Sequence, residues 1–304
     1  MTKPKRLLGH LAQLGSVVVF SCGFMVQKLL VTQYAAPTIL FWQFLGAALV
    51  MWAICAVRRM LPMVGRRLLL TLVWGAMAPG LVMILNIVGG AKTDGVSLAL
   101  MWGLLPLIAP LFGFFFLKEY PHWTLWMGAA VGFGGLLALA INREGAGIGS
   151  LTGNIFVLLA VLCASFSQIA GRTLNKGDAP WFQVATLQVS GAFLAVLIFA
   201  AATGSVPLLS LAMPIHVFAM AYLVLIMTVL NYALFNFALK QLPVAWVSIY
   251  VALNPVFGAL AAIVVLDETP RFIDWIGMAI IVSGVVLPHI YVLTQRNRSK
   301  VDIG

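Results

Sequence analysis

Charged residues are scarce in this chain, and their scarcity excludes most classes of soluble protein. Asp, Glu, Lys and Arg together make up 9% of the 304 residues, against about 25% in an ordinary globular domain. Apolar residues make up 62%, and the mean hydropathy is +1.07. A water-facing surface cannot be built from so few polar side chains. The composition therefore excludes a soluble enzyme and a disordered protein, and it indicates a membrane protein.

Cysteine is equally rare. The three cysteines, Cys22, Cys55 and Cys163, form no CxxC pair and are followed by no histidine cluster. Neither a disulfide framework nor a zinc site is expected, and nothing else in the sequence calls for a metal or a cofactor. The net charge of +10 would suit nucleic acid if the basic residues gathered on one face or arm. Because they punctuate apolar runs instead, nucleic acid is not an expected partner.

Long apolar runs fill the rest of the sequence and predict ten membrane spans. A helix needs about 20 apolar residues to cross a bilayer. Lys28 and Asp274 are the only charged residues within the predicted spans, and each lies near the end of its span. The expected fold is an all-α integral membrane protein in contact with the lipid bilayer. The ten predicted spans are 11–31, 38–57, 68–91, 95–117, 122–141, 151–171, 181–203, 214–239, 244–266 and 272–294.

Basic residues are distributed unequally between the two sides of such a membrane. With ten spans both termini lie on one side, and 14 of the 18 Lys and Arg residues fall on that side. Basic residues collect in cytoplasmic loops. Both termini are therefore expected in the cytoplasm, as parts of a polytopic plasma membrane protein.

The second half of the chain repeats the first. A shift of 149 residues superposes Glu119 on Glu268, which is informative because the chain has only three Glu. A shift of 145 superposes the pattern Q-x-x-G-A-x-L at Gln43 on the same pattern at Gln188. Two helical repeats of five spans each are therefore expected.

The predicted division is a first five-helix repeat at 1–141, a glycine-rich connector at 142–150 and a second five-helix repeat at 151–304. Since five is odd, the second repeat enters the membrane from the opposite side. Inverted repeats of this kind are typical of secondary transporters, which carry their substrate near the interface of the repeats by alternating access.

The repeated segments resemble the EamA repeat of the drug/metabolite transporter superfamily. The resemblance implies an exporter of small organic metabolites, such as amino acids or drug-like compounds, in a bacterial inner membrane. It also implies that the fourth and ninth spans sit at the repeat interface. Two departures are Phe20-Ser21-Cys22-Gly23, where the family often has Trp-Gly, and Gln43, where it often has Arg. The matching residues are Lys28, Pro106, Leu117-Lys118-Glu119, Trp126, Gly128 and Gly135, then Pro255-Val-Phe, Leu266-Asp267-Glu268, Trp275-Ile276-Gly277 and Ser283-Gly284-Val285.

Prolines near the middle of three predicted spans are candidate hinges or breaks. Pro106 and Pro255 fall near the middle of the fourth and ninth spans, where each removes a helical hydrogen bond and frees a carbonyl group. Each is predicted to be a hinge beside the substrate path or a packed kink. Pro79 and Gly80 break the third span more severely. The corresponding place near Val229 has neither residue, which predicts unequal gates in the two halves.

Uncharged polar side chains within the spans are expected to face protein or a watery cavity, because burying them in hydrocarbon is costly. Asn254 is the strongest candidate for substrate binding, since it directly precedes Pro255. Trp102 and Tyr250 occupy nearly corresponding places and are predicted to stack on a planar substrate or to pack within the protein. Gln43 and Gln188 are interpreted as packing pairs. The other candidates for the substrate path are Ser21, Asn86, Ser165, Gln168 and Asn231.

Glu119 and Glu268 lie where spans meet loops and are interpreted as caps or as partners of nearby cations, with Lys118 and Arg271 close in sequence. Together with Lys28 they are the candidates for a structural or proton-coupling role. The spans offer no committed proton site otherwise. His289 is interpreted as a structural residue in the last span, which leaves uniport and an unconventional coupling group as alternatives.

Two further questions concern enzymatic activity and assembly. The alternative to a transporter is a membrane enzyme acting on lipid or polyprenyl substrates, but the eight acidic residues and four histidines are scattered, and such chemistry needs them clustered. The glycine-rich faces of the fifth and tenth spans allow close helix approach, either in a homodimer or within one chain.

Overall fold

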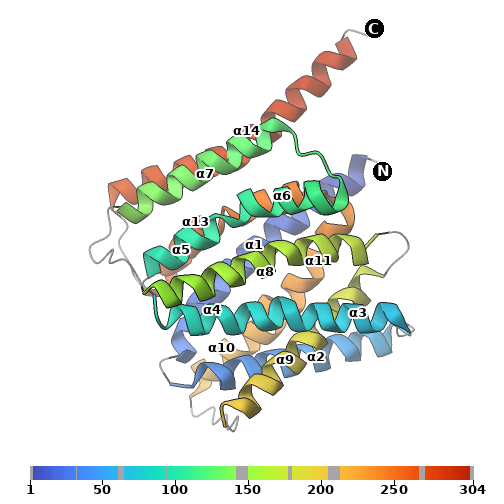
Figure 1. Cartoon of the computed structure of the whole chain (residues 1–304), viewed down its shortest axis with the longest axis vertical. Coiled ribbons are helices and arrows are strands. Elements are labelled where there is room, and N and C mark those ends of the chain that lie inside the picture. Colours follow the sequence, from blue (N-terminus) through green and yellow to red (C-terminus); the bar gives the residue numbers. More distant parts are fainter. Residues whose placement is uncertain are drawn as a thin grey trace.

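The computed structural model describes residues 3–31, 33–60, 65–93, 95–141, 150–176, 180–204, 213–266 and 271–301, and every regular element in these ranges is helical (Figure 1). The first half contains α1 (Lys3–Val31), α2 (Ala36–Val57), α3 (Arg66–Gly75), the π-helix η1 (Ala76–Leu81), α4 (Val82–Gly90), α5 (Gly95–Gly103), α6 (Leu105–Leu117) and α7 (Trp123–Ile141). The second half contains α8 (Leu151–Leu174), α9 (Trp181–Ala202), α10 (Pro214–Tyr222), the π-helix η2 (Leu223–Leu230), α11 (Asn231–Gln241), α12 (Val244–Val251), α13 (Asn254–Leu266) and α14 (Phe272–Val301).

Seven stretches of the described chain are long and apolar enough to cross a membrane, which confirms a polytopic, all-helical membrane protein. The predicted connector at 142–150 lies outside the described residues except for Ser150, whose hydroxyl caps α8 by accepting from the Gly153 amide at 3.0 Å. A count of ten crossings stays a prediction. The seven stretches are Ala36–Val57, Arg66–Gly90, Leu151–Leu174, Trp181–Ala202, Pro214–Gln241, Val244–Ala261 and Phe272–Tyr291, and two shorter apolar helices are Met101–Leu117 and Trp123–Ala138.

The two halves pack against each other through corresponding helices. α7 lies along α14, as the upper part of Figure 1 shows, and α2 packs against α9. The other contacts come in matched sets. α1 packs against α11 of the second half, and its counterpart α8 packs against α4 of the first half. Equivalent contacts of this kind are expected where two halves are related by a twofold axis. The centre of the molecule therefore lies at the interface between the halves.

Both halves interrupt their third span with a π-helix, η1 in the first half and η2 in the second. Only the first of these π-helices contains a break, because no residue within η2 leaves the helical region. The asymmetry expected at Pro79 therefore holds, whereas unequal gates stay a prediction. Ala78 has the non-helical angles φ −147° and ψ 114°, since a residue before proline is pushed away from the helical region.

Pro106 and Pro255 begin helices rather than kinking them. α6 begins at Leu105 and α13 at Asn254, so both prolines lie in a first turn, where a missing N–H group costs little. The predicted mid-span kinks are instead breaks between two helices. Leu104 in the first half and Leu253 in the second lie in these breaks at corresponding positions.

Glycines bring α7 and α14 together backbone to backbone. A Cβ atom at Gly128 would clash with the Gly284 carbonyl oxygen, and one at Gly135 would clash with the Gly277 carbonyl oxygen. These glycine faces are therefore used within one chain, as small residues are at close helix contacts in membranes. A homodimer stays a prediction.

Candidate functional site

Two neighbouring cavities lie between the halves. The larger has a volume of about 330 Å³ and the smaller about 120 Å³. Phe20, Trp102, Val251 and Asn254 line both cavities and come from α1, α5, α12 and α13, so each half contributes to their shared wall. A cavity of at least 300 Å³ is large enough for a small organic ligand.

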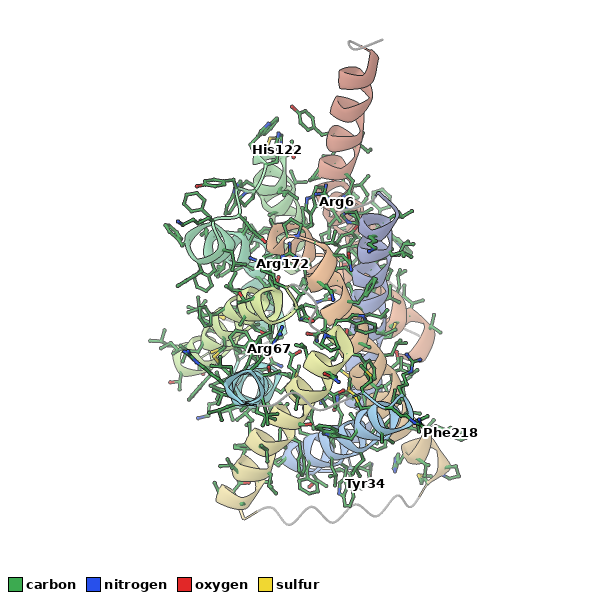
Figure 2. All side chains as sticks on the ribbon, turned by 90° about the vertical axis from the view of Figure 1, so that its right-hand side faces the viewer. Arg6, Tyr34, Arg67, His122, Arg172 and Phe218 are labelled. Carbon is green, nitrogen blue, oxygen red and sulfur yellow. The ribbon has the colours of Figure 1, made fainter. Side chains whose placement is uncertain are left out.

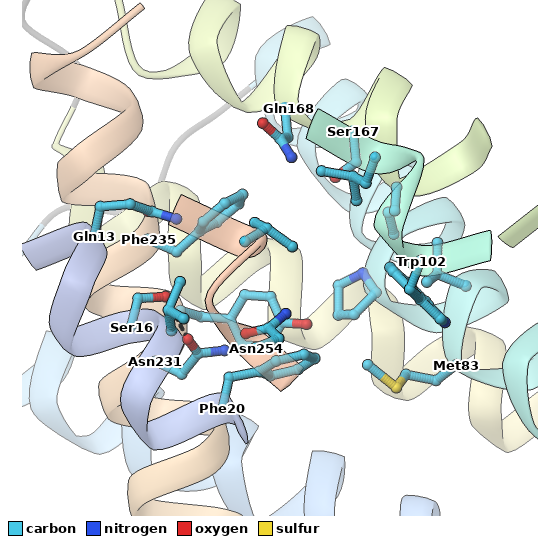
Figure 3. Close-up of a pocket in the computed structure, with 18 of the residues that line it drawn as sticks. Gln13, Ser16, Phe20, Met83, Trp102, Ser167, Gln168, Asn231, Phe235 and Asn254 are labelled. Atoms are coloured by element: carbon cyan, nitrogen blue, oxygen red, sulfur yellow. Dashed lines mark hydrogen bonds between the residues drawn. The ribbon is translucent and has the colours of Figure 1, made fainter. Parts of the chain in front are cut away.

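The walls combine amide and hydroxyl groups with aromatic rings. Figure 3 shows the smaller cavity, with Gln13 and Phe235 on one side and Trp102 and Met83 across from them. Of the residues that the structure describes, no Asp, Glu, Lys, Arg or His lines either cavity. A wall without fixed charge disfavours a ligand with a net charge, because no opposite charge in the wall balances it. The ionised or polar groups of a ligand would have to be met by the amide and hydroxyl groups.

Two buried amide oxygens in the smaller cavity have no hydrogen-bond partner in the described part of the chain, Oε1 of Gln13 and Oε1 of Gln168. The side chains are 1% and 3% exposed. The Gln13 amide nitrogen is engaged, because it donates to the Val247 carbonyl oxygen at 3.1 Å. A buried acceptor without a donor costs about 1–3 kcal/mol. Since each oxygen has almost no accessible surface, a ligand that carries N–H or O–H groups would remove that cost once the glutamine side chain turned toward it.

Hydrogen bonds orient the polar groups near the shared wall. The Trp102 indole nitrogen donates to Asn86 Oδ1 at 2.7 Å. The Ser21 hydroxyl oxygen lies 2.9 Å from Asn254 Oδ1 and 2.7 Å from the Val17 carbonyl oxygen. The indole and the Asn254 amide are therefore held in fixed orientations by groups outside the smaller cavity.

The repeated glutamines reach across to the π-helices of the opposite half. Gln43 of α2 donates to the Thr228 hydroxyl in η2 at 2.9 Å. Gln188 of α9 donates to the Ala78 carbonyl oxygen in η1 at 3.0 Å, and its own oxygen accepts from Asn236 at 2.8 Å. Only Gln188 lines a cavity. The interpretation of both glutamines as packing pairs therefore missed that one of them faces the cavity.

Most of the predicted substrate-path residues lie on the cavity walls, although their contact with a substrate stays a prediction. Trp102 and Asn254 line both cavities. Those that line the smaller cavity alone are Gln168 and Asn231, and those that line the larger cavity alone are Ser21, Asn86 and Pro255. Pro79, predicted as a helix break, also lines the smaller cavity.

Three of the predicted substrate-path residues, and Gly80 of the predicted helix break, line neither cavity. Tyr250 is bound to two histidine rings, His10 and His289. Pro106 begins α6, and Ser165 is fully buried in α8. Gly80 faces α9, where a Cβ atom would clash with Ala195.

Sequence reasoning missed part of the wall. Gln13, Ser16 and Phe20 of α1 line the smaller cavity with Val17, and their spacing of three or four residues places them on one helix face. This spacing was readable in the sequence. The distant residues have no such signal, because only the packing of the halves brings them in; they are Ser167, Gln188, Tyr232 and Phe235.

Glu119 is paired with Arg172, and not with the adjacent Lys118. Glu119 Oε1 lies 3.1 Å from Arg172 Nε, and Oε2 accepts from the Val244 amide at 2.8 Å, at the start of α12. Arg172 also donates to the carbonyl oxygens of Leu239 and Lys240 at 2.7 and 2.9 Å. The pair therefore joins the ends of α6, α8 and α11 to the start of α12.

Two other candidates for a structural or coupling role give no comparable geometry. Glu268 lies outside the described residues, as does the side chain of Lys28. The structure describes Arg271, which pairs with Asp274 at 3.5 Å.

The sequence profile of the EamA-like transporter family matches residues 7–141 and again residues 151–288. The chain belongs to this family. The two matches show two EamA repeats, with 142–150 between them. The EamA fold also agrees with a solved structure described as "Crystal structure of protein", which is 18% identical and has a TM-score of 0.75 over 93% of this chain and 96% of that one. No curated protein sequence matches the chain.

Proposed function

We propose that this EamA protein exports small organic metabolites without net charge, such as zwitterionic amino acids or neutral drug-like compounds, by alternating access between its two repeats. The two cavities are the binding site. Family membership supports transport, and the observation that carries the substrate class is the uncharged wall shared by both halves. Export, with cytoplasmic termini and a bacterial inner membrane, follows from the family resemblance and from the excess of basic residues on the terminal side.

The wall suggests how each part of such a substrate is held. The free oxygens of Gln13 and Gln168 accept from an ammonium or hydroxyl group. The Trp102 ring offers a face for an apolar or planar side chain. Since Trp102, Asn254, Phe20 and Val251 separate the two cavities, a small movement of this wall moves the substrate from one cavity to the other.

The alternative of a membrane enzyme is not favoured. Among the described residues, no carboxylate, amine or imidazole lines the cavities to act as a general acid or base. The same part of the chain contains no group of three or more His, Cys, Asp or Glu side chains that could hold a metal ion.

Trp102→Ala and Asn254→Ala are expected to reduce transport at least fivefold each. Each removes a contact that both cavities use, and losing one buried hydrogen bond or ring contact of about 1 kcal/mol gives a factor of about five. The measurement is flux of labelled neutral amino acids and of organic cations into and out of proteoliposomes.

Trp275→Ala is the matched control, because Trp275 is 49% exposed on α14 and lines neither cavity. If both cavity variants transport as fast as the wild type, the cavities are not part of the substrate path. Flux of cations but not of neutral amino acids would contradict the proposed substrate class.

Gln188→Leu and Gln43→Leu form a second matched pair. Both lose one buried hydrogen bond to a π-helix of the opposite half and are expected to lower stability by about 1–2 kcal/mol. Only Gln188 lines a cavity, so only Gln188→Leu is expected to reduce transport per folded molecule. Parallel measurements of unfolding and flux separate the two effects, and equal flux in the two variants would count against the cavity.

A further inference from the structure

A cluster of titratable side chains lies one helical turn away from the smaller cavity and is not part of its wall. His10 of α1, Tyr250 of α12 and His289 of α14 come from three separate helices. The imidazole rings have centroids 5.2 Å apart, and the Tyr250 hydroxyl contacts both. The Trp246 ring covers the cluster, with its centroid 4.4 Å from that of His289.

We propose that His10, Tyr250 and His289 form a proton-binding site that couples proton movement to transport. The coupling rests on the transport function proposed above, whereas proton binding itself does not. Imidazole is the side chain whose charge changes most readily near neutral pH. A hydrogen-bonded pair of imidazoles between three helices is therefore suited to carry a proton.

The hydrogen-bonding capacity of each atom determines which group donates in each hydrogen bond of the cluster. His289 Nδ1 lies 2.8 Å from the Val285 carbonyl oxygen, which only accepts, so Nδ1 carries a hydrogen and Nε2 of the neutral ring accepts. Nε2 lies 2.8 Å from the Tyr250 hydroxyl, which must donate to it. The hydroxyl oxygen then accepts from His10 Nδ1 at 3.1 Å.

With the donors assigned in this way, one imidazole nitrogen of the cluster has no hydrogen-bond partner among the described residues. With a hydrogen on Nδ1, neutral His10 has a lone pair on Nε2, and that atom has no hydrogen-bond partner in the described part of the chain. The ring is only partly buried, unlike the Tyr250 side chain, which is 8% exposed. His10 Nε2 is therefore the place where a proton enters.

A proton that binds there can pass along the cluster without movement of a heavier atom. The His10 imidazolium gives its Nδ1 proton to the Tyr250 oxygen while the Tyr250 hydroxyl proton moves to His289 Nε2. His10 is then neutral with its hydrogen on Nε2, Tyr250 is neutral again, and His289 carries the charge. Because two imidazolium ions at this separation repel each other, the cluster holds one proton at a time.

The surrounding helices do not neutralise this charge with an acid. Burial, the neighbouring His289 and the cation of Arg6, one turn before His10 on α1, all lower the pKa of His10 (Figure 2). Lys240 lies in the last turn of α11, which packs against α1, and Arg172 of α8, which packs against α12, is already paired with Glu119. The described segments of α7 and α13, which pack against α14, contain no charged residue.

The cluster and the smaller cavity share two helices. On α1, His10 and Gln13 are three residues apart and lie on the same face, and on α12 Tyr250 directly precedes Val251 of the shared wall. Gln13 also binds the Val247 carbonyl oxygen of α12. A relative movement of α1, α12 and α14 therefore changes the cavity and breaks or forms the proton chain at the same time.

Proton binding is tested by NMR of ¹⁵N-labelled histidine in nanodiscs, since the chain has only four histidines. In the wild type at high pH, His10 should carry hydrogen on Nδ1 and His289 on Nδ1. The titration midpoint of His10 should move in His289→Gln and in Tyr250→Phe. The His10 midpoint should be unchanged in His216→Gln. The His216 ring contacts the Tyr34 hydroxyl at 3.1 Å, far from Arg6 (Figure 2). If the titration midpoint of His10 is the same in the wild type, His289→Gln and Tyr250→Phe, the proposed proton site is wrong.

Coupling is tested by accumulation of a labelled neutral amino acid in proteoliposomes under a gradient of one pH unit. One proton per neutral substrate permits up to tenfold accumulation. The wild type and His216→Gln should approach this value, whereas His10→Gln and His289→Gln should give no accumulation above onefold. If the wild type only equilibrates the substrate across the membrane, the proposed coupling is wrong but transport is confirmed. If the wild type transports no amino acid, the proposed function is wrong, and the NMR titration alone then tests the proton site.

Discussion

Arg172→Met is expected to lower the free energy of unfolding by about 3 kcal/mol. The substitution leaves the Glu119 carboxylate without its cation, in a place where the two side chains are only 18% and 14% exposed. It also leaves the carbonyl oxygens of Leu239 and Lys240 without the guanidinium group that donates to them. Removing one partner of a buried ion pair typically costs about 3–5 kcal/mol, and the residual exposure places this pair at the lower end.

Charge and geometry can be separated at this pair. Arg172→Lys keeps the charge but loses the planar group that reaches Glu119 and α11 together, so it should recover only part of the loss. Glu119→Gln still accepts from the Val244 amide. The double variant Glu119→Gln with Arg172→Met should therefore be less damaged than the two single losses added together. The measurement is reversible unfolding in mixed micelles, and strictly additive losses would show that the pair is not coupled.

The helices themselves were predictable from the sequence because a bilayer imposes a simple rule of length and apolarity. Every described helix overlaps a predicted apolar run, although α1 begins at Lys3, before the predicted 11–31, and α14 continues to Val301, beyond the predicted 272–294. The repeat was readable for a related reason. Glutamate is so rare in this chain that Glu119 and Glu268 cannot match by composition alone.

The interruptions of the helices were only partly predictable. Pro79 signalled the break in the third span, but η2 in the second half has no proline or glycine to mark it. Its π-turn depends on packing against α2, where Gln43 binds Thr228, and such a contact between distant residues has no local sequence pattern. The sequence predicted an interruption at Pro255. It did not predict that Pro255 lies in the first turn of α13, because that position depends on where α12 ends.

The candidate site shows the same limit. Residues of α1 share a readable helical face, whereas Gln188 and Tyr232 reach the cavity only because α9 and α11 pack beside it. From the sequence, Tyr250 was predicted to stack on a planar substrate or to pack within the protein. Its side chain instead points to His10 and His289, and His10 lies 240 positions before Tyr250 in the chain.

Gly191→Leu is expected to abolish folding of most of the protein. A Cβ atom at Gly191 would fall on the Leu72 carbonyl oxygen and the Ala76 amide nitrogen, and one at Gly75 would fall on the Gln188 carbonyl oxygen. The contacts are backbone against backbone, so no flexible side chain can move aside. Overpacking that displaces a helix costs about 3 kcal/mol or more, and this contact also brings Gln188 within reach of Ala78.

The matched control for this substitution is Gly134→Leu on α7, where a Cβ atom would meet nothing within 4 Å. It should fold as well as the wild type or better, since glycine in a helix is less favourable than leucine by roughly 0.5–1 kcal/mol. The yield of monodisperse protein after size-exclusion chromatography distinguishes the two variants. Gly191→Ala supplies the intermediate case. It adds only the Cβ atom, but that atom already falls on the Leu72 carbonyl oxygen, so α3 and α9 must separate. Gly191→Ala is therefore expected to lower stability, although less than leucine does, and to reduce transport because Gln188 moves away from the Ala78 carbonyl oxygen. If Gly191→Ala transports like the wild type, the spacing of these two helices does not set the geometry of the cavity.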